Sequence, residues 1–438
     1  MTHYDTIVIG AGPGAMSVGP VLAAKQKVLM VERDKWGGTC PNRGCDPKKV
    51  LYNVTATYLQ AQRFAGVGMP AVGPLDWAAL RQFESEYTQN VSANMRAGMA
   101  SSMDVVDGSA SFKDAHTLDV DGTEYSADNI VIATGAAPTP LPVVGGNLLL
   151  SSDDFLSLEE MPSSLAFIGA GYITAELASI ASAAGAKVHV IQVNDRFLAG
   201  MPKADSQALE AALTARGVQF HWNTSVDAVE KEDGRLRLHT SNGELLVGSA
   251  IAAIGRTPAI ADLNLARAGV QADKHGVIVD AHMQTSVPNI FALGDVVSSR
   301  RPKLTPVASF EGAYVAKFIL GETAPIEYPV IPTVAYSFPQ LAQVGINADD
   351  ADPEKYTVKR QQVGNWFNYW HMKDPDAMVT TVIDKQTGEL CGASIFAAET
   401  EELINAFTQL INQKATLAQV NGMISAYPTY SSDLPYYL

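Results

Sequence analysis

Two of the three cysteines, Cys40 and Cys45, lie in the glycine-rich stretch 37–49 with four residues between them. Thiols this close in sequence can close a small disulfide ring and reopen it by accepting two electrons. Pro47 and the two lysines after it are typical of the first turn of a helix. A helix start carries unpaired backbone N–H groups, which favour a thiolate at Cys45. The alternatives are ordinary buried cysteines or half of a metal site, and the spacing alone leaves them open.

The cysteines follow, by a few residues, a pattern that is typical of dinucleotide binding. An apolar strand over residues 6–9 runs into the turn GAGPGA, a helical stretch and a second strand that ends on Glu32. Gly10 makes the tight turn, Gly12 lets the backbone approach a pyrophosphate, and Glu32 is placed to accept a ribose hydroxyl. A glycine turn alone is a weak signal, but the full strand–turn–helix–strand–acid pattern is strong.

A second pattern of the same kind begins at Leu165. Its turn contains Gly169 and Gly171, and its next strand ends at Gln192. Two such units imply two bound dinucleotides. Beside a cysteine pair, these are most simply a flavin and a nicotinamide.

Further elements must position these candidates. Continuous apolar runs that end in small-residue turns predict buried strands at 129–135, 250–256 and 288–295, and the last of these delivers Asp295 at its end. Helical segments are expected from the cysteines to about residue 64 and over 77–99, with a small antiparallel sheet over 105–121. From about residue 329, short strands at 333–336, 341–345, 378–383 and 391–397 and a helix at 399–413 predict a separate α+β domain.

Composition narrows the class of protein. A chain of 438 residues with 47% hydrophobic and 18% charged residues predicts two or three well-packed domains. Its 31 basic and 46 acidic residues give a net charge of −15, which disfavours nucleic acid or an anionic membrane as a partner. With three cysteines and no targeting signal at the N-terminus, a reducing cytoplasm is the expected compartment. No apolar stretch is long enough to span a bilayer.

The order of these motifs resembles one family. The chain resembles the FAD-dependent pyridine nucleotide-disulfide oxidoreductases, the flavoprotein disulfide reductases that include glutathione reductase, dihydrolipoamide dehydrogenase and mercuric reductase. The resemblance rests on GAGPGA, GGTCPNRGC, ATG, GAGYITAE, GRTP and FALGD, and it covers essentially the whole length. It implies an α/β fold with two Rossmann-like dinucleotide-binding domains and a C-terminal α+β dimerisation domain. The expected domains are 1–145 with 266–328 for FAD, 146–265 for NAD(P)H, and 329–438 for the interface of a homodimer.

The resemblance also implies roles for single residues. Cys45 would face the flavin, Cys40 would attack the substrate, and Lys48 and Glu176 would form an ion pair beside the flavin ring. A fixed cation there stabilises negative charge on the reduced flavin. Tyr172 would cover the flavin until the nicotinamide displaces it. The expected cofactor-binding residues are Gly10, Gly12, Gly14, Glu32, Thr39, Gly135, Gly169, Gly171, Tyr172, Gln192, Gly255 and Asp295, and no metal site is expected.

The C-terminal segment departs from the family pattern. Disulfide-reducing members carry a His-Pro-Thr segment and a nearby glutamate, and the histidine protonates the departing thiolate. Here Tyr427 stands in the place of the histidine and Ser432 in that of the glutamate, and no histidine follows His371. A phenol is a much weaker acid than an imidazolium at neutral pH. Tyr427 is therefore either a slow proton donor or a packing residue of the interface.

Substrate and nicotinamide preference follow from smaller departures. Pro20 and Ala313 occupy two positions where glutathione reductases hold the tripeptide with arginines, although Tyr87 resembles a tyrosine of that pocket. Arg43, inside the redox loop, is expected to face solvent. Gln192 is neutral where NAD-selective members carry an acid, which slightly favours NADPH over NADH.

Three functions compete at this point. The first is an NAD(P)H-dependent reductase that passes electrons through FAD and the Cys40–Cys45 pair to a small disulfide other than glutathione disulfide. The second uses the same relay for a metal ion, a quinone or another small oxidant, because such acceptors need no protonation of a thiolate. The third is a redox sensor or binding flavoprotein without turnover.

Overall fold

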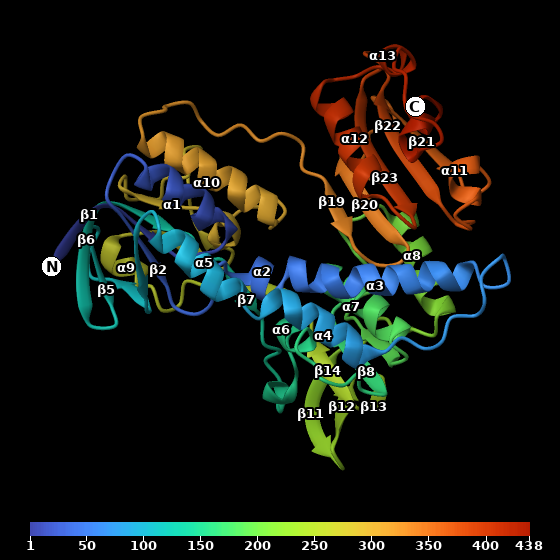
Figure 1. Cartoon of the computed structure of the whole chain (residues 1–438), viewed down its shortest axis with the longest axis horizontal. Helices are drawn as coiled ribbons and strands as arrows, with labels where there is room; N and C mark the ends of the chain where they lie inside the picture. The colour runs from blue at the N-terminus through green and yellow to red at the C-terminus, as the bar shows by residue number, and fades with distance from the viewer. The chain divides into compact units, whose positions relative to one another are not determined.

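The computed structural model describes all residues from 1 to 438 and shows two compact units, each built from three stretches of chain. The first unit contains Met1–Lys48, Gln82–Thr139 and Arg256–Glu327, and the second contains Lys49–Arg81, Pro140–Gly255 and Tyr328–Leu438 (Figure 1). The division into three domains with the boundaries given above stays a prediction. Among the helices, none combines the length and the apolar composition that a membrane span requires.

A seven-stranded sheet organises the first unit. Its strands follow the order β3-β2-β1-β6-β5-β4, and β18 pairs with the free stretch of β6. The strands β3, β2, β1, β6 and β18 are parallel, whereas β4, β5 and β6 form an antiparallel meander. The bounds are β1 Thr2–Ile9, β2 Val28–Glu32, β3 Asp104–Asp107, β4 Ala110–Phe112, β5 Thr117–Val120, β6 Thr123–Ile132 and β18 Ile290–Ala292.

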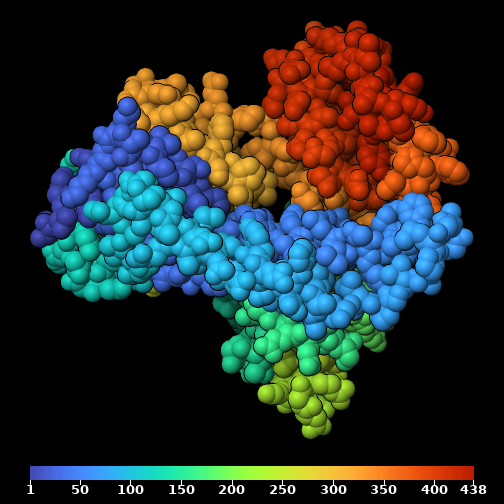
Figure 2. Space-filling view, in the orientation of Figure 1, coloured from blue at the N-terminus to red at the C-terminus, as the bar shows by residue number.

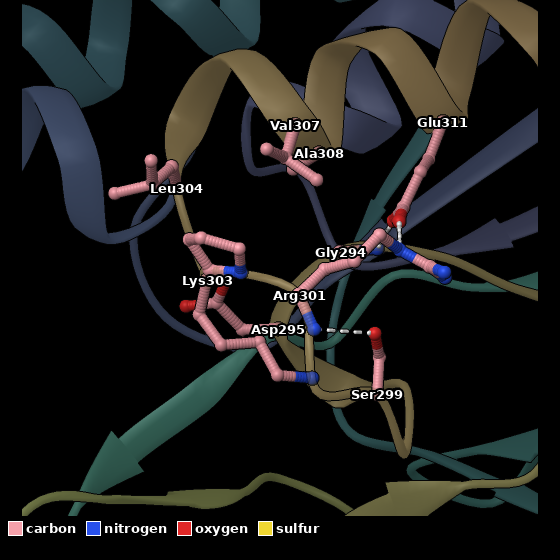
Figure 3. A pocket seen from close by; sticks show the side chains of 10 residues that line it. Gly294, Asp295, Ser299, Arg301, Lys303, Leu304, Val307, Ala308 and Glu311 are labelled. Atoms are coloured by element: carbon pink, nitrogen blue, oxygen red, sulfur yellow. Dashed lines mark hydrogen bonds and ion pairs between the residues drawn. The ribbon is translucent and has the colours of Figure 1, made fainter. Parts of the chain in front are cut away.

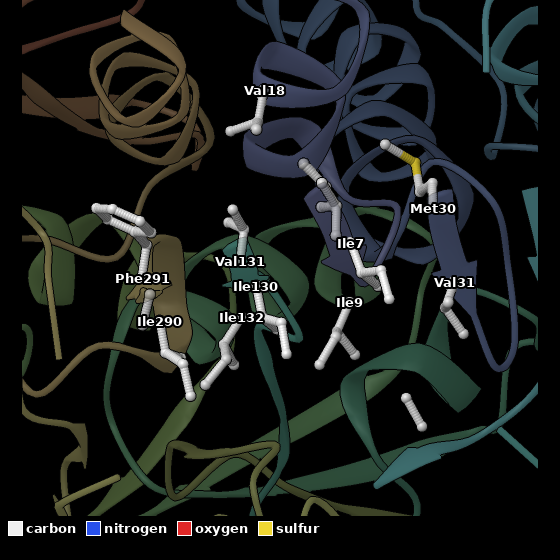
Figure 4. Close-up of a cluster of buried hydrophobic side chains, with 14 of the residues drawn as sticks. Ile7, Ile9, Val18, Met30, Val31, Ile130, Val131, Ile132, Ile290 and Phe291 are labelled. Carbon is white, nitrogen blue, oxygen red and sulfur yellow. The ribbon is translucent and has the colours of Figure 1, made fainter. Parts of the chain in front are cut away.

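The central strands are apolar on both faces. Ile7 of β1 and Ile130 of β6 are fully buried, and Phe291 of β18 lies beside them in the same cluster (Figure 4). The strands of a parallel sheet are buried on both faces because helices cover them. The continuous apolar runs in the sequence therefore correctly predicted strands. Smaller elements of this unit are β7 Ala136–Pro138, β15 Arg256–Pro258, α9 Leu265–Ala268, β16 Ala272–Asp273 and β17 Gly276–Val277.

Two helices, α1 (Pro13–Ala23) and α10 (Thr305–Ile319), pack side by side on this sheet (Figure 1). Glycines make the contact close. A Cβ atom on Gly312 would lie 2.3 Å from the carbonyl oxygen of Gly14, and one on Gly14 would lie 2.4 Å from Leu293 Cδ1. Gly14 is therefore needed for helix packing.

The second unit contains the second nucleotide pattern and the C-terminal residues. Its parallel sheet has the order β10-β9-β8-β14, and a three-stranded antiparallel sheet β11-β12-β13 accompanies it. The bounds are β8 Ser164–Ile168, α7 Tyr172–Ala183, β9 Lys187–Ile191, α8 Lys203–Ala215, β10 Gln219–His221, β11 Val226–Glu232, β12 Arg235–Thr240, β13 Gly243–Val247 and β14 Ser249–Ala252; the short helix α6 spans Ser152–Phe155.

The C-terminal residues form a five-stranded antiparallel sheet in the order β19-β20-β23-β22-β21. The helix α12 (Glu401–Asn412) packs against β20 and β23, and this part forms one continuous body, orange to red in Figure 2. The remaining bounds are β19 Thr333–Ala335, β20 Gln340–Gly345, β21 Tyr356–Gln362, α11 Phe367–Trp370, β22 Met378–Asp384, β23 Leu390–Ala397, α13 Leu417–Asn421 and α14 Leu434–Tyr437. The expected α+β character of this region is confirmed.

Two local expectations were wrong. The single helix expected over 77–99 is two helices, α4 (Trp77–Thr88) and α5 (Val91–Ala100). They separate at Gln89 and Asn90, and asparagine disfavours a helix interior because its side chain competes for backbone hydrogen bonds. The small sheet expected over 105–121 is no separate sheet, since β4 and β5 extend the main one.

Candidate active site

The first glycine turn forms a cradle that a side chain would fill. Gly10 has φ +104°, and a Cβ atom there would lie 2.4 Å from the carbonyl oxygen of Ala133. Gly12 caps the start of α1 without any side-chain hydrogen bond, so the first backbone N–H groups of the helix stay open to a ligand. A helix N-terminus of this kind favours a phosphate group. These residues fit the pyrophosphate of a dinucleotide.

Two polar groups beside the cradle extend the fit. The carboxylate of Glu32 accepts hydrogen bonds from the backbone N–H of Ala11 at 2.8 Å and of Asp34 at 2.9 Å, which fixes it at the glycine turn. The hydroxyl of Thr134, two residues after the end of β6, is buried and has no hydrogen-bond partner within the protein. A buried hydroxyl without a protein partner fits a hydrogen bond to a bound ligand. Gly135 follows it with φ +67°, and nothing lies within 4 Å of the position that a Cβ atom would take there.

The redox loop packs directly against this cradle. Gly37 donates its N–H to the carbonyl of Ala11 at 3.0 Å, and a Cβ atom on Gly38 would lie 2.7 Å from the Cα of Gly12. Two helices follow. The short helix α2 spans Thr39–Arg43, and the long helix α3 begins at Cys45 and ends at Arg63. The glycines thus bring the cysteines next to the dinucleotide cradle, as the sequence predicted.

Both cysteines of the loop are present as half-buried thiols. The hydrogen bond to Cys45 raises the pKa of the Cys40 thiol, and burial raises it further. Cys45 is the first residue of the long helix α3, where the helix dipole favours negative charge. These two effects favour a thiolate on Cys45 and a protonated thiol on Cys40, and the roles of the two residues stay a prediction.

Two further side chains reach the redox loop from distant parts of the chain. The hydroxyl of Thr305, the first residue of α10, lies 3.8 Å from the sulfur of Cys45. The guanidinium of Arg256 donates to the carbonyl of Ala136 at 2.6 Å and to the hydroxyl of Thr39 at 3.4 Å. Thr305 and Arg256, which follow Cys45 by more than 200 positions, therefore contact the redox loop and the segment beside it directly.

A small pocket that is open to solvent lies at the start of α10 (Figure 3). Asp295 lines it, and burial raises the pKa of its carboxyl, an effect that Lys303 and Arg256 partly offset. Glu311 accepts a hydrogen bond from the N–H of Gly294 at 2.7 Å and so holds the loop that carries Asp295. The pocket contains a carboxylate suited to a sugar-like hydroxyl, and the role of Asp295 stays a prediction.

The second glycine turn repeats the geometry of the first. Gly169 also has φ +104°, and its Cβ atom would lie 2.4 Å from the carbonyl oxygen of Ala253. Gly171 caps α7 without a side-chain hydrogen bond. Gly255 has φ +122° and open space around it. The matching cradles fit two dinucleotides, one in each compact unit.

Gln192 directly follows β9, where a ribose-binding side chain is expected, and its side-chain oxygen accepts from the N–H of Val193 at 3.2 Å. The nearest basic residue of this segment, Arg196, donates to the carbonyl of Met201 at 2.6 Å and lies 3.6 Å from Asp349. Asp349 thus partly neutralises the one cation that the segment offers to a phosphate.

The remaining predicted residues lie as follows. Tyr172 begins α7, and its hydroxyl lies 3.5 Å from the hydroxyl of Thr333. Glu176 is buried on α7, where its carboxylate accepts from the N–H of Tyr336 at 2.9 Å. Lys48 belongs to the first unit and Glu176 to the second, and the ion pair between them stays a prediction.

Tyr427 lies on the surface of the C-terminal sheet domain, and 75% of its accessible area is exposed. Ser432 forms a reciprocal cap with Thr429 at the start of a short helical turn. Asn368 then donates to the carboxylate of Asp433 at 2.8 Å. In a single chain these residues stabilise the C-terminal turn, and Tyr427 projects into solvent.

Sequence reasoning missed Asp46 beside the cysteines and Glu311 beneath Asp295. The sulfur of Cys40 donates to Asp46 at 3.6 Å. An acid directly after the second cysteine was the available signal. Arg43, expected to face solvent, forms an ion pair with Asp34.

Comparisons with known proteins agree with this geometry. Residues 4–312 match the model of the pyridine nucleotide-disulphide oxidoreductase family, and residues 331–436 match its dimerisation domain. Dihydrolipoyl dehydrogenase of Geobacillus stearothermophilus is 32% identical over 97% of this chain and 93% of its own length. Glutathione reductase of Burkholderia cepacia is 31% identical over 98% and 97%.

Solved structures give the same result. The HOCl-induced flavoprotein disulfide reductase RclA from Escherichia coli is similar with a TM-score of 0.90 and 25% identity, over 98% of both chains. The Cu(II) complex of the same protein matches with a TM-score of 0.91 over 100% of this chain and 99% of the other, also at 25% identity.

Proposed function

Because the chain belongs to the pyridine nucleotide-disulphide oxidoreductase family, we propose that it reduces a small disulfide other than glutathione disulfide. The family uses FAD and NAD(P)H, and the two glycine cradles fit these cofactors. Bound FAD would supply the transfer of two electrons from the nicotinamide to the cysteine pair. The observation that carries the proposal is the Cys40–Cys45 pair, two free cysteines in one loop that packs against the first glycine cradle.

We propose that Gly10, Gly12, Glu32, Thr134 and Asp295 hold FAD in the first unit. Gly169 and Gly171 hold the nicotinamide nucleotide in the second, together with Gly255, Tyr172 and Gln192. Since Gln192 is neutral and Asp349 offsets the charge of Arg196, we expect only a small preference for NADPH over NADH. Steady-state kinetics with both nucleotides measure that preference.

The dimerisation domain supports a homodimer. Large apolar side chains are exposed on it, among them Trp370 at 66% and Ile424 at 101% of their accessible area, and Tyr427 belongs to the same domain. Exposed apolar surface of this kind favours association. We propose that this surface forms the dimer interface and brings Tyr427 toward the active site of the partner.

Glutathione disulfide is expected to be a poor substrate. Pro20 of α1 and Ala313 of α10 offer no charge to the carboxylates of the tripeptide, and the Asp46 carboxylate beside Cys40 repels them. Hydrogen bonds to charged groups contribute about 1.5–3 kcal/mol each, so kcat/KM should be about tenfold to hundredfold lower than for a neutral disulfide. The measurement is NAD(P)H oxidation with glutathione disulfide, lipoamide and hydroxyethyl disulfide. Equal values for all three would contradict this specificity.

A second candidate is reduction of a metal ion. It is favoured by Tyr427 in the place of a histidine and by the likeness to the E. coli protein that has been solved as a Cu(II) complex. Oxidation of the dithiol to the disulfide would reduce two Cu(II) ions to Cu(I), and no departing thiolate would need a proton. A higher kcat/KM with Cu(II) than with every disulfide would favour this function. Disulfide turnover that is lost in Tyr427→Phe and kept in the exposed control Tyr436→Phe would reject it.

A further inference from the structure

A carboxylate is held between a thiol and a phenol beside the redox pair. The sulfur of Cys40 donates a hydrogen bond to Asp46 Oδ1 at 3.6 Å, and the hydroxyl of Tyr87 donates to Asp46 Oδ2 at 2.8 Å. Both oxygens of the carboxylate are thus oriented, one of them toward the sulfur that attacks the substrate. All three residues belong to the first compact unit.

The local fold favours this arrangement. A Cβ atom on Gly44 would lie 3.1 Å from the Cα of Cys40, so the glycine allows the loop to turn back on itself. Asp46 follows in the first turn of α3, where the helix dipole favours an acid. Tyr87 lies near the end of α4 and reaches the same carboxylate from a different part of the chain.

We propose that Asp46 is a catalytic residue that carries the proton from Cys40 to the thiolate released by the substrate, and that Tyr87 is a positioning residue. This inference rests on the proposed disulfide reductase function. It supplies, from the redox loop itself, a proton donor in place of the histidine that the C-terminal segment lacks. The contact with the reacting sulfur is the observation that carries it.

The step balances as follows. Cys40 Sγ bonds to one sulfur of the substrate while the substrate S–S bond breaks, and its proton passes to Asp46 Oδ1. The proton then moves to the departing thiolate, which leaves as a thiol. The thiolate of Cys45 displaces the second half of the substrate from Cys40, and this half takes a proton from water. Two electrons have passed from the dithiol to the substrate, and the Cys40–Cys45 disulfide is ready for reduction by NAD(P)H through the family's relay.

The acidity of a carboxyl group suits the transfer of a proton from a thiol to a departing thiolate. A carboxylic acid is a much stronger acid than an alkyl thiol, so a proton that reaches the carboxylate continues readily to a departing alkyl thiolate. The neighbouring Cys45 and burial raise the pKa of the Cys40 thiol, which favours a thiol that still carries its proton when a substrate arrives. Burial raises the pKa of Tyr87 to about 12, so its hydroxyl remains a donor that holds the carboxylate in place.

Two neutral disulfides test the role of Asp46 in the holoenzyme. Hydroxyethyl disulfide releases a basic alkyl thiolate that needs a proton, whereas dipyridyl disulfide releases a stabilised thiolate that departs without one. The measurement is the rate at which the NAD(P)H-reduced enzyme is reoxidised by each compound. In Asp46→Asn we expect reoxidation by hydroxyethyl disulfide to slow about 10²-fold or more, and by dipyridyl disulfide less than about tenfold. Tyr87→Phe should shift the ratio of the two rates in the same direction, by a smaller factor.

The chain offers a matched control in Asp104→Asn. Asp104 also accepts a tyrosine hydroxyl, that of Tyr4 at 2.9 Å, but it lies at the start of β3 and therefore at the opposite edge of the parallel sheet from the redox loop. This variant should leave both rates unchanged. If Asp46→Asn accelerates both disulfides or slows both equally, the carboxylate acts on charge or structure and the proton transfer is refuted. Failure of the unaltered enzyme to turn over either disulfide would instead refute the proposed function.

Discussion

Replacing Cys45 with serine is expected to abolish turnover and, with it, the long-wavelength absorbance that a thiolate gives beside an oxidised flavin. Cys45 begins α3, where the helix dipole stabilises its thiolate. A serine hydroxyl does not ionise at neutral pH and cannot form the disulfide. NAD(P)H-dependent reduction of any disulfide should therefore fall by more than about 10³-fold. Anaerobic titration with NADPH, followed by absorbance, measures the loss.

Two other cysteine variants separate the roles. Cys40→Ser should keep the absorbance band, because Cys45 is intact, and lose disulfide turnover. Cys391→Ser is the matched control, since this thiol lies on β23 in the second unit, and it should retain both properties. A Cys45→Ser enzyme with an unchanged spectrum on reduction would overturn the assignment of the inner thiol.

Replacing Gly10 with alanine is expected to prevent FAD binding and destabilise the first unit. At φ +104° an L-residue costs about 1–2 kcal/mol. The new Cβ atom would also lie 2.4 Å from the carbonyl oxygen of Ala133, which forces the end of β6 to move. Such overpacking typically costs about 1–3 kcal/mol, so the combined loss is about 2–5 kcal/mol. The ratio of FAD to protein and the temperature of thermal unfolding report it.

Gly122→Ala separates the steric effect from the backbone effect. Gly122 has φ +88° in the turn between β5 and β6, but nothing lies within 4 Å of its Cβ position. This control should lose stability by about 1–2 kcal/mol and keep its FAD. Gly169→Ala repeats the clash in the second unit, at Ala253, and should keep FAD while losing reduction by NAD(P)H. Full FAD content in Gly10→Ala would contradict the cradle.

Local patterns explain why much of the site could be predicted. Gly10 and Glu32 belong to one continuous strand–turn–helix–strand segment, and their roles follow from backbone geometry within it. The same holds for Gly169 and Gly171. The two cysteines could be recognised as a candidate redox pair because they are only five positions apart in the sequence. In each case the interaction that matters is short in sequence.

Other parts of the site depend on contacts between distant segments. Tyr87 meets Asp46 across 41 positions, and Thr305 meets Cys45 across 260. No periodicity or spacing encodes such a pair, because it arises only when helices α4 and α10 pack beside the redox loop. The helix expected over 77–99 failed for a related reason, since a pattern over that stretch does not show where the chain bends.

By itself, the sequence determined the two dinucleotide units, the redox cysteine pair and the missing C-terminal histidine, because each resides in a contiguous run of residues. Only the tertiary structure decided which groups surround the outer thiol. It closes the redox loop onto Gly12, orients the Asp46 carboxylate toward Cys40 and brings Tyr87 to hold it. The physical reason is that a hydrogen bond depends on a few tenths of an ångström and on direction, which packing of distant elements sets.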